Sequence, residues 1–146
     1  MKKLFALLII VGCNTPMPKP KGMLAMNYPP PVYQKANTDC PFTFDFNSLS
    51  SIKVQSNCFF SVSYPSMKAK VYMSYFNLNE HKIDDLYRDF NARLMEHTKQ
   101  EARIQESSYE NISQKKYGRF FEITSNAPSN LHYLVTDQKN HLISGV

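Results

Sequence analysis

The feature that most constrains the fold is a change in the spacing of apolar residues near residue 80. From Glu80 to Glu106 the chain contains neither Pro nor Gly. Apolar residues in this stretch recur at intervals of three and four, as on one face of a helix; they are Ile83, Leu86, Tyr87, Phe90 and Leu94. The pattern predicts one long amphipathic helix from Glu80 to about Glu106. Its single apolar stripe has to be buried against another element.

Stretches on both sides of this helix alternate between apolar and polar residues, as half-buried strands do. Expected strands lie around residues 42–46, 58–64, 69–76, 120–124, 132–136 and 141–146. In the strand expected at 58–64, one face carries Phe60, Val62 and Tyr64. In the strand expected at 69–76, one face carries Ala69, Val71, Met73 and Tyr75. Short spacing between strands predicts antiparallel pairing. We therefore expect an α+β fold, an antiparallel sheet with the helix packed on a face. At the level of this pattern it is similar to Mog1/PsbP-like domains.

The N-terminus has the layout of a secretory signal. Lys2 and Lys3 precede an uncharged apolar run, residues 4–11, which is far shorter than the ~20 residues that span a bilayer. The run leads into Ile10-Val11-Gly12-Cys13, which resembles the lipobox of bacterial lipoproteins. The resemblance implies that residues 1–12 are removed as a signal peptide. It also implies that the Cys13 sulfur carries a diacylglycerol with acyl chains such as palmitate. Two acyl chains suffice for stable anchoring. The alternative is an ordinary signal peptide with a chance Cys.

The segment after Cys13 is expected to be a tether. Pro16, Pro18 and Pro20 favour a semi-rigid, extended spacer. A short strand at residues 23–28 is possible within residues 13–39, and three consecutive prolines would end it. A single α+β domain is expected to follow at residues 40–146.

The charge of the chain does not indicate a nucleic-acid-binding protein. The formal net charge is +5, and removal of Lys2 and Lys3 would lower it by two to +3. Nucleic-acid-binding proteins gather basic residues on one face. Here Lys and Arg are interspersed with acidic residues.

Two cysteines remain after Cys13. In an oxidising compartment Cys40 and Cys58 can form a disulfide, and a loop of this length would contribute ~3 kcal/mol. Two buried thiols are the alternative. Because neither Cys belongs to a CxxC pair, a metal or redox site is not expected.

The sequence contains no catalytic motif of the GxSxG, HExxH, P-loop or GxGxxG type, and we expect neither enzymatic activity nor a cofactor. His81 and Asp85 have the spacing of two metal ligands on a helix, but two ligands fall short of the usual site, which favours a solvated helix start and no metal. Asp137 follows a strand without an evident partner, which favours a turn-capping role over acid–base chemistry.

Three aromatic residues form a candidate protein interface: Tyr64, Tyr72 and Phe76. They do not all fit one buried face, and a shared exposed patch would be a docking surface. The alternative is a two-sided sheet, with the helix on one face and loops on the other.

An ordered set of segments resembles the gliding-motility lipoprotein family GldD. The set comprises Pro18-Lys19-Pro20-Lys21-Gly22, Asn27-Tyr28-Pro29, Cys40-Pro41-Phe42-Thr43-Phe44, Cys58-Phe59-Phe60, the block from Tyr64 to Val71, Tyr117-Gly118 and Thr136-Asp137. That family continues past the position of Gly145 with an aromatic strand and a further segment. The domain at residues 40–146 is therefore expected to be incomplete at its C-terminus.

The GldD resemblance implies a non-catalytic, lipid-anchored component of the gliding motility and type IX secretion machinery. Its partners would be the membrane and other envelope proteins of that machinery. The protein would face the periplasm, with the outer membrane favoured over the inner membrane. The alternative function is a small periplasmic ligand-binding or hydrolytic lipoprotein.

Overall fold

A computed structural model describes residues 27–97, 103–124 and 127–146. The chain divides into two compact units, residues 1–30 and 31–146. The described part of the first unit, residues 27–30, is exposed and has no regular secondary structure. Most of the short strand expected at residues 23–28 lies outside the described residues, and its last two residues are not in a strand.

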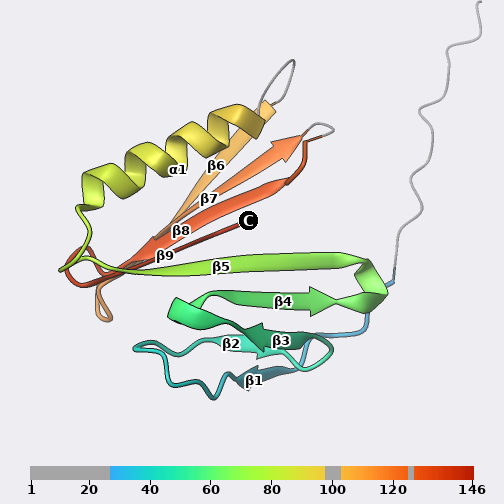
Figure 1. Ribbon diagram of the computed structural model, residues 1–146. Helices are drawn as coiled ribbons and strands as arrows, with labels where there is room; N and C mark the ends of the chain where they lie inside the picture. Colours follow the sequence, from blue (N-terminus) through green and yellow to red (C-terminus); the bar gives the residue numbers. More distant parts are fainter. Residues whose placement is uncertain (1–26, 98–102, 125–126) are drawn as a thin grey trace, which may run out of the picture. The chain divides into compact units, whose positions relative to one another are not determined.

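The second unit contains a seven-stranded antiparallel sheet and a separate two-stranded sheet (Figure 1). The small sheet pairs β1 (Tyr33–Lys35) with β2 (Asp45–Asn47). The large sheet has the order β3-β4-β5-β9-β8-β7-β6. Its strands are β3 (Ser51–Val54), β4 (Phe60–Tyr64), β5 (Ala69–Asn77), β6 (Arg103–Asn111), β7 (Lys116–Thr124), β8 (Leu131–Thr136) and β9 (His141–Gly145). Two 3-10 turns, η1 (Ser56–Cys58) and η2 (Pro65–Met67), flank β4.

The single helix of the described residues, α1, spans Ile83–His97. The expected helix was therefore too long, because the stretch from Arg103 to Glu106 belongs to β6. β6 is an edge strand that is exposed over almost its whole length, so no buried face imposes an apolar alternation on its sequence. Its register is set by nine pairs with β7 across a turn in which Lys115 is left-handed.

The structure confirms an antiparallel sheet with one helix on a face, and it adds strands that the pattern did not predict. β1, β3 and β6 were missed, because they are short or lie at sheet edges where most side chains are exposed. The predicted faces of β4 and β5 are correct. In the register, Phe60 pairs with Met73, Val62 with Val71, and Tyr64 with Ala69.

The core between α1 and the sheet is built from five buried residues: Phe90, Leu94, Phe121, Ile123 and Leu134. The ring of Phe90 lies 5.5 Å from that of Phe121 and 6.3 Å, edge to face, from His132 on β8. Tyr87 packs against the same cluster. The apolar stripe read from the sequence is therefore the face that α1 lays on β7 and β8 (Figure 1).

The opposite face of the sheet has its own aromatic core. Phe60 is fully buried, and Val62 and Met73 are nearly so. Phe42 and Phe44, which precede β2, both contact the Phe60 ring edge to face, at centroid distances of 5.5 and 5.3 Å. The chain before β2 thus covers part of β4 and β5 on the face opposite α1.

On the second face of the sheet, the Tyr133 ring lies so close to the backbone of β9 that a glycine is required at position 145. A Cβ built on Gly145 would overlap the backbone oxygen of Tyr72 and the ring of Tyr133, its cross-strand neighbour on β8. Burial raises the pKa of Tyr133 to about 12, so its phenol stays neutral at physiological pH. The absence of a side chain at Gly145 makes room for the Tyr133 ring within the second face.

A disulfide joins Cys40 to Cys58, with Cα atoms 5.9 Å apart and a sequence separation of 18. The possible bridge is thus present, and the alternative of two thiols is wrong for this structure. The bond connects the segment ahead of Phe42 to η1, directly before β4. It therefore holds the covering segment against the sheet.

The turn between β8 and β9 is organised by Asp137. One oxygen of its carboxylate accepts hydrogen bonds from the backbone N–H groups of Lys139, Asn140 and His141, at 3.0, 2.8 and 2.8 Å. Burial alone would raise the pKa of Asp137, but these three hydrogen bonds and the nearby His141 together hold that pKa below its usual value. The predicted turn-capping position of Asp137 agrees with this geometry.

Replacing both Cys40 and Cys58 with Ser is expected to lower the free energy of unfolding by ~3 kcal/mol, because the unfolded chain regains the freedom that the closed loop removes. Thermal unfolding followed by circular dichroism measures this as a drop in Tm of roughly 10 °C. A reductant should lower the Tm of the wild type and leave the double variant unchanged. An equal response of both proteins to reductant would contradict the prediction.

Replacing Asp137 with Ala is expected to lower the free energy of unfolding by about 1–3 kcal/mol at pH 7, because three backbone donors lose a charged acceptor. The pKa of Asp137 is lower in the folded state than in the unfolded chain. Its ionised form therefore stabilises the fold fully above the pKa of an unfolded aspartate. That contribution is lost as the pH falls through the lower folded-state pKa.

Denaturant titrations of the wild type and Asp137→Ala between pH 7 and pH 2 measure the difference. The gap in unfolding free energy should shrink below about pH 4. Asp137→Asn is the matched control, because its amide oxygen still accepts hydrogen bonds without the charge. A gap that stays constant down to pH 2 would refute the role of the carboxylate charge.

Candidate functional site

The sites inferred from the sequence lie in different parts of the chain. Cys13 lies outside the described residues, so its lipidation stays a prediction. In the part of the chain that the structure describes, no helix has the length and apolar character needed to cross a membrane.

The three candidate interface aromatics do not share one surface. Tyr64 lies on the second face of the sheet, in alternation with Phe60 and Val62. Tyr72 and Phe76 lie on the α1 side of β5. The structure thus brings two of the three residues to one side and places Tyr64 on the other.

Tyr72 and Phe76 line a hollow of about 240 Å³ beside α1. Tyr72 is 40% exposed, and its ring stacks on that of Phe59 at 6.1 Å. Phe90 and Arg93 of α1 form the other wall. We call the surface of Phe59, Tyr72 and Phe76 the aromatic hollow.

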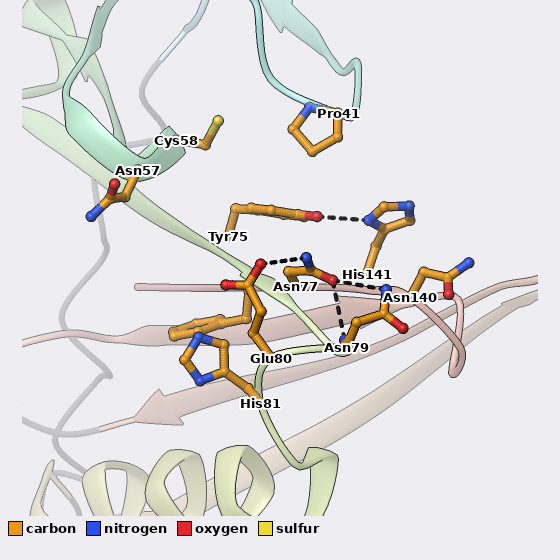
Figure 2. Close-up of a pocket in the computed structure, with 11 residues that line it drawn as sticks. Pro41, Asn57, Cys58, Tyr75, Asn77, Asn79, Glu80, His81, Asn140 and His141 are labelled. Carbon is orange, nitrogen blue, oxygen red and sulfur yellow. Dashed lines mark hydrogen bonds between the residues drawn. The ribbon is translucent and has the colours of Figure 1, made fainter.

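An open pocket of about 860 Å³ lies at the end of β5. Four short segments meet there: the chain around the Cys40–Cys58 disulfide, the end of β5, the turn before α1, and the β8–β9 turn (Figure 2). Its lining residues are Pro41, Asn57, Cys58, Tyr75, Phe76, Asn77, Asn79, Glu80, His81, Asn140 and His141. We call this the polar pocket.

Tyr75 and His141 form one wall of the polar pocket. They lie diagonally to each other on the paired strands β5 and β9, and the phenol oxygen lies 2.8 Å from Nδ1 of the imidazole. Burial, aided by the acidic side chains of Glu80 and Asp137, raises the pKa of Tyr75. Tyr75 therefore keeps its proton at neutral pH. When that proton is donated to Nδ1, the neutral imidazole carries its own proton on Nε2.

Asn77 organises the second wall. Its Nδ2 donates to Glu80 Oε1 at 2.8 Å, and its Oδ1 accepts from the backbone N–H and the Nδ2 of Asn79, both at 3.1 Å. The other carboxylate oxygen of Glu80 points away from Asn77 (Figure 2). The Phe76 and His81 rings meet edge to face at 5.8 Å below this network. These contacts hold the polar groups in fixed positions.

The polar pocket is lined by hydrogen-bonding side chains and by one negatively charged side chain. Its lining contains four Asn, two His and one Glu, and no Lys, Arg, Ser or Thr. The sulfur of Cys58 is held in the disulfide. No group of three or more potential metal-ligating side chains occurs among the described residues. The arrangement can bind a neutral or cationic polar molecule.

His81 and Asp85, which have the spacing of two helical metal ligands but for which the sequence favours a solvated helix start, lie in different surroundings. His81 precedes α1 and lines the polar pocket, whereas Asp85 lies in the first turn of α1 and forms an ion pair with Arg88 at 2.9 Å. The partner of Asp85 on the helix is thus Arg88.

Sequence reasoning missed the convergence of Tyr75, Glu80 and His141. Tyr75 and His141 are 66 residues apart and meet only because β5 pairs with β9. The one local signal was the cluster Asn77-Leu78-Asn79-Glu80, whose short polar side chains favour turns that organise their own backbone.

Comparisons with known proteins identify the family. Searches of curated proteins and of solved structures returned no match, so the similarity to Mog1/PsbP-like domains stays a prediction. A family model described as "Gliding motility lipoprotein GldD" matches residues 13–146. That match begins at Cys13 and covers all the described residues. The chain belongs to the family of gliding motility lipoproteins GldD.

Proposed function

We propose that this protein is a non-catalytic component of the gliding motility apparatus and the linked type IX secretion machinery, anchored by lipid and facing the periplasm. The observation that carries this proposal is the family match over residues 13–146, which starts at the residue where the lipobox predicts cleavage. The charged and apolar leader ahead of Cys13 supports export.

A diacylglycerol on Cys13 would supply the membrane attachment. The proline-rich segment that follows would space the folded unit from the bilayer. The outer membrane is the proposed location in preference to the inner membrane. Other envelope proteins of the same machinery are the proposed partners.

The aromatic hollow supports a protein-binding role. Aromatic residues are enriched where protein interfaces form, and an exposed apolar patch indicates an interaction site. Tyr72 is the most exposed of its three rings. We therefore propose the hollow as the contact for an envelope partner.

A second candidate function is ligand binding in the periplasm, with hydrolysis as its variant. The polar pocket is the observation that favours binding, because polar groups from four segments converge in one concave site.

Deletion of the gene in its native host is expected to abolish colony spreading, since the family match assigns the protein to gliding. Replacing Cys13 with Ala should abolish spreading as well, because the chain loses its anchor. Mass spectrometry of the wild-type protein should find diacylglycerol on an N-terminal Cys13. Normal spreading of the deletion strain would refute the role in gliding, and an unmodified N-terminus would refute the anchor.

Replacing Tyr72 with Ala is expected to reduce the recovery of cross-linked envelope partners roughly tenfold, as loss of a central aromatic contact does at interfaces. The Tm should stay within a few degrees of the wild type, because the ring is 40% exposed. Tyr109→Ala is the control, since Tyr109 is a half-exposed tyrosine on β6. A large fall in Tm without loss of partners would show that Tyr72 belongs to the core.

A further inference from the structure

The polar pocket has features that define the chemistry of its ligand, independently of the role in gliding. Its only carboxylate belongs to Glu80, and no Lys or Arg lies in its lining. An anionic ligand such as a phosphate would meet this negative charge without a compensating cation. This lining therefore favours a neutral or cationic ligand over an anion.

The hydrogen-bonding groups favour a ligand with many hydroxyls. Asn57 and Asn140 lie at the rim with their side-chain amides pointing outward (Figure 2), and each amide has two donors and an acceptor for a ligand that extends over the rim. Glu80 adds acceptor oxygens, and Nε2 of His141 adds a donor in the tautomer that accepts from Tyr75. Hydroxyl groups both donate and accept, so a polyol matches this mixture, whereas an amine could use only the acceptors.

The apolar groups of the same pocket suit the C–H faces of a sugar ring. Pro41, Tyr75 and Phe76 contribute ring surface beside the polar groups. The Tyr75 ring is held by stacking on Phe42, with centroids 5.4 Å apart and planes at 25°. A sugar presents hydroxyls at its edge and C–H groups on its face, which matches a lining with polar groups and ring surface side by side.

Fixed geometry is the fourth feature. Asn77 positions Glu80, Tyr75 positions His141, and Asp137 holds the backbone of Asn140 and His141. Groups that are already ordered lose little conformational entropy when a ligand binds. The pocket volume of about 860 Å³ lies in the range of small-molecule sites.

We propose that the polar pocket at the end of β5 binds a neutral saccharide. The amides, Glu80 and His141 bind its hydroxyl groups, and Tyr75 and Phe76 contact its apolar faces. The volume accommodates a short oligosaccharide rather than a single sugar.

Isothermal titration of the full chain in detergent with N,N′,N″-triacetylchitotriose and with cellotriose tests this proposal. These two neutral probes differ in their N-acetyl groups, which separates recognition of an amide from recognition of hydroxyls alone. We expect saturable binding of at least one probe with a Kd of about 1 mM or tighter. Putrescine, a small cationic amine, is titrated in parallel.

Glu80→Ala and Asn140→Ala each remove polar atoms from the lining and should weaken saccharide binding roughly tenfold. Glu80 is exposed, so its variant should keep the Tm of the wild type. Asn91→Ala, at an exposed position of α1 outside the pocket, is the control and should bind as the wild type does.

Three outcomes would overturn the proposal. They are the absence of saturable binding of either saccharide, unchanged affinity in both pocket variants, and binding of putrescine without either saccharide. None of these measurements depends on gliding. A failure here and normal spreading of the deletion strain therefore refute different claims.

Discussion

The packing of Phe90 against Phe121 and His132 attaches the only described helix to the sheet, and much of the remaining structure depends on it. A sheet with apolar residues on both faces is stable only when both are covered. α1 covers β7 and β8, and Phe42 and Phe44 cover Phe60 on the other face. Removing either cover would expose apolar surface to water.

The polar pocket follows from how these two covers are connected to the sheet. Its walls are the places where the chain leaves one layer and enters another: the disulfide segment, the end of β5 and the β8–β9 turn. Backbone groups at such places lack strand partners, so short polar side chains satisfy them. Asn77 and Asp137 do this here. The same side chains that complete the turns also order the groups that line the pocket.

Two surfaces of different chemistry adjoin at Phe76. The aromatic hollow lies on the α1 side of β5, and the polar pocket lies at the end of that strand; Phe76 lines both. Protein contact in the hollow and ligand contact in the pocket would therefore involve the same ring.

The sequence by itself determined the elements whose residues face a core. The helix stripe from Ile83 to Leu94 and the alternation in β4 and β5 follow from local periodicity, because burial selects apolar residues at a fixed spacing. The family was also readable from ordered segments along the chain. The exposed edge strand β6 was not readable, because no buried face shaped its sequence. Only the tertiary structure decided the site. Strand pairing and the β8–β9 turn bring His141 to Tyr75 and Glu80, and no local spacing records a contact between Tyr75 and a residue 66 positions away.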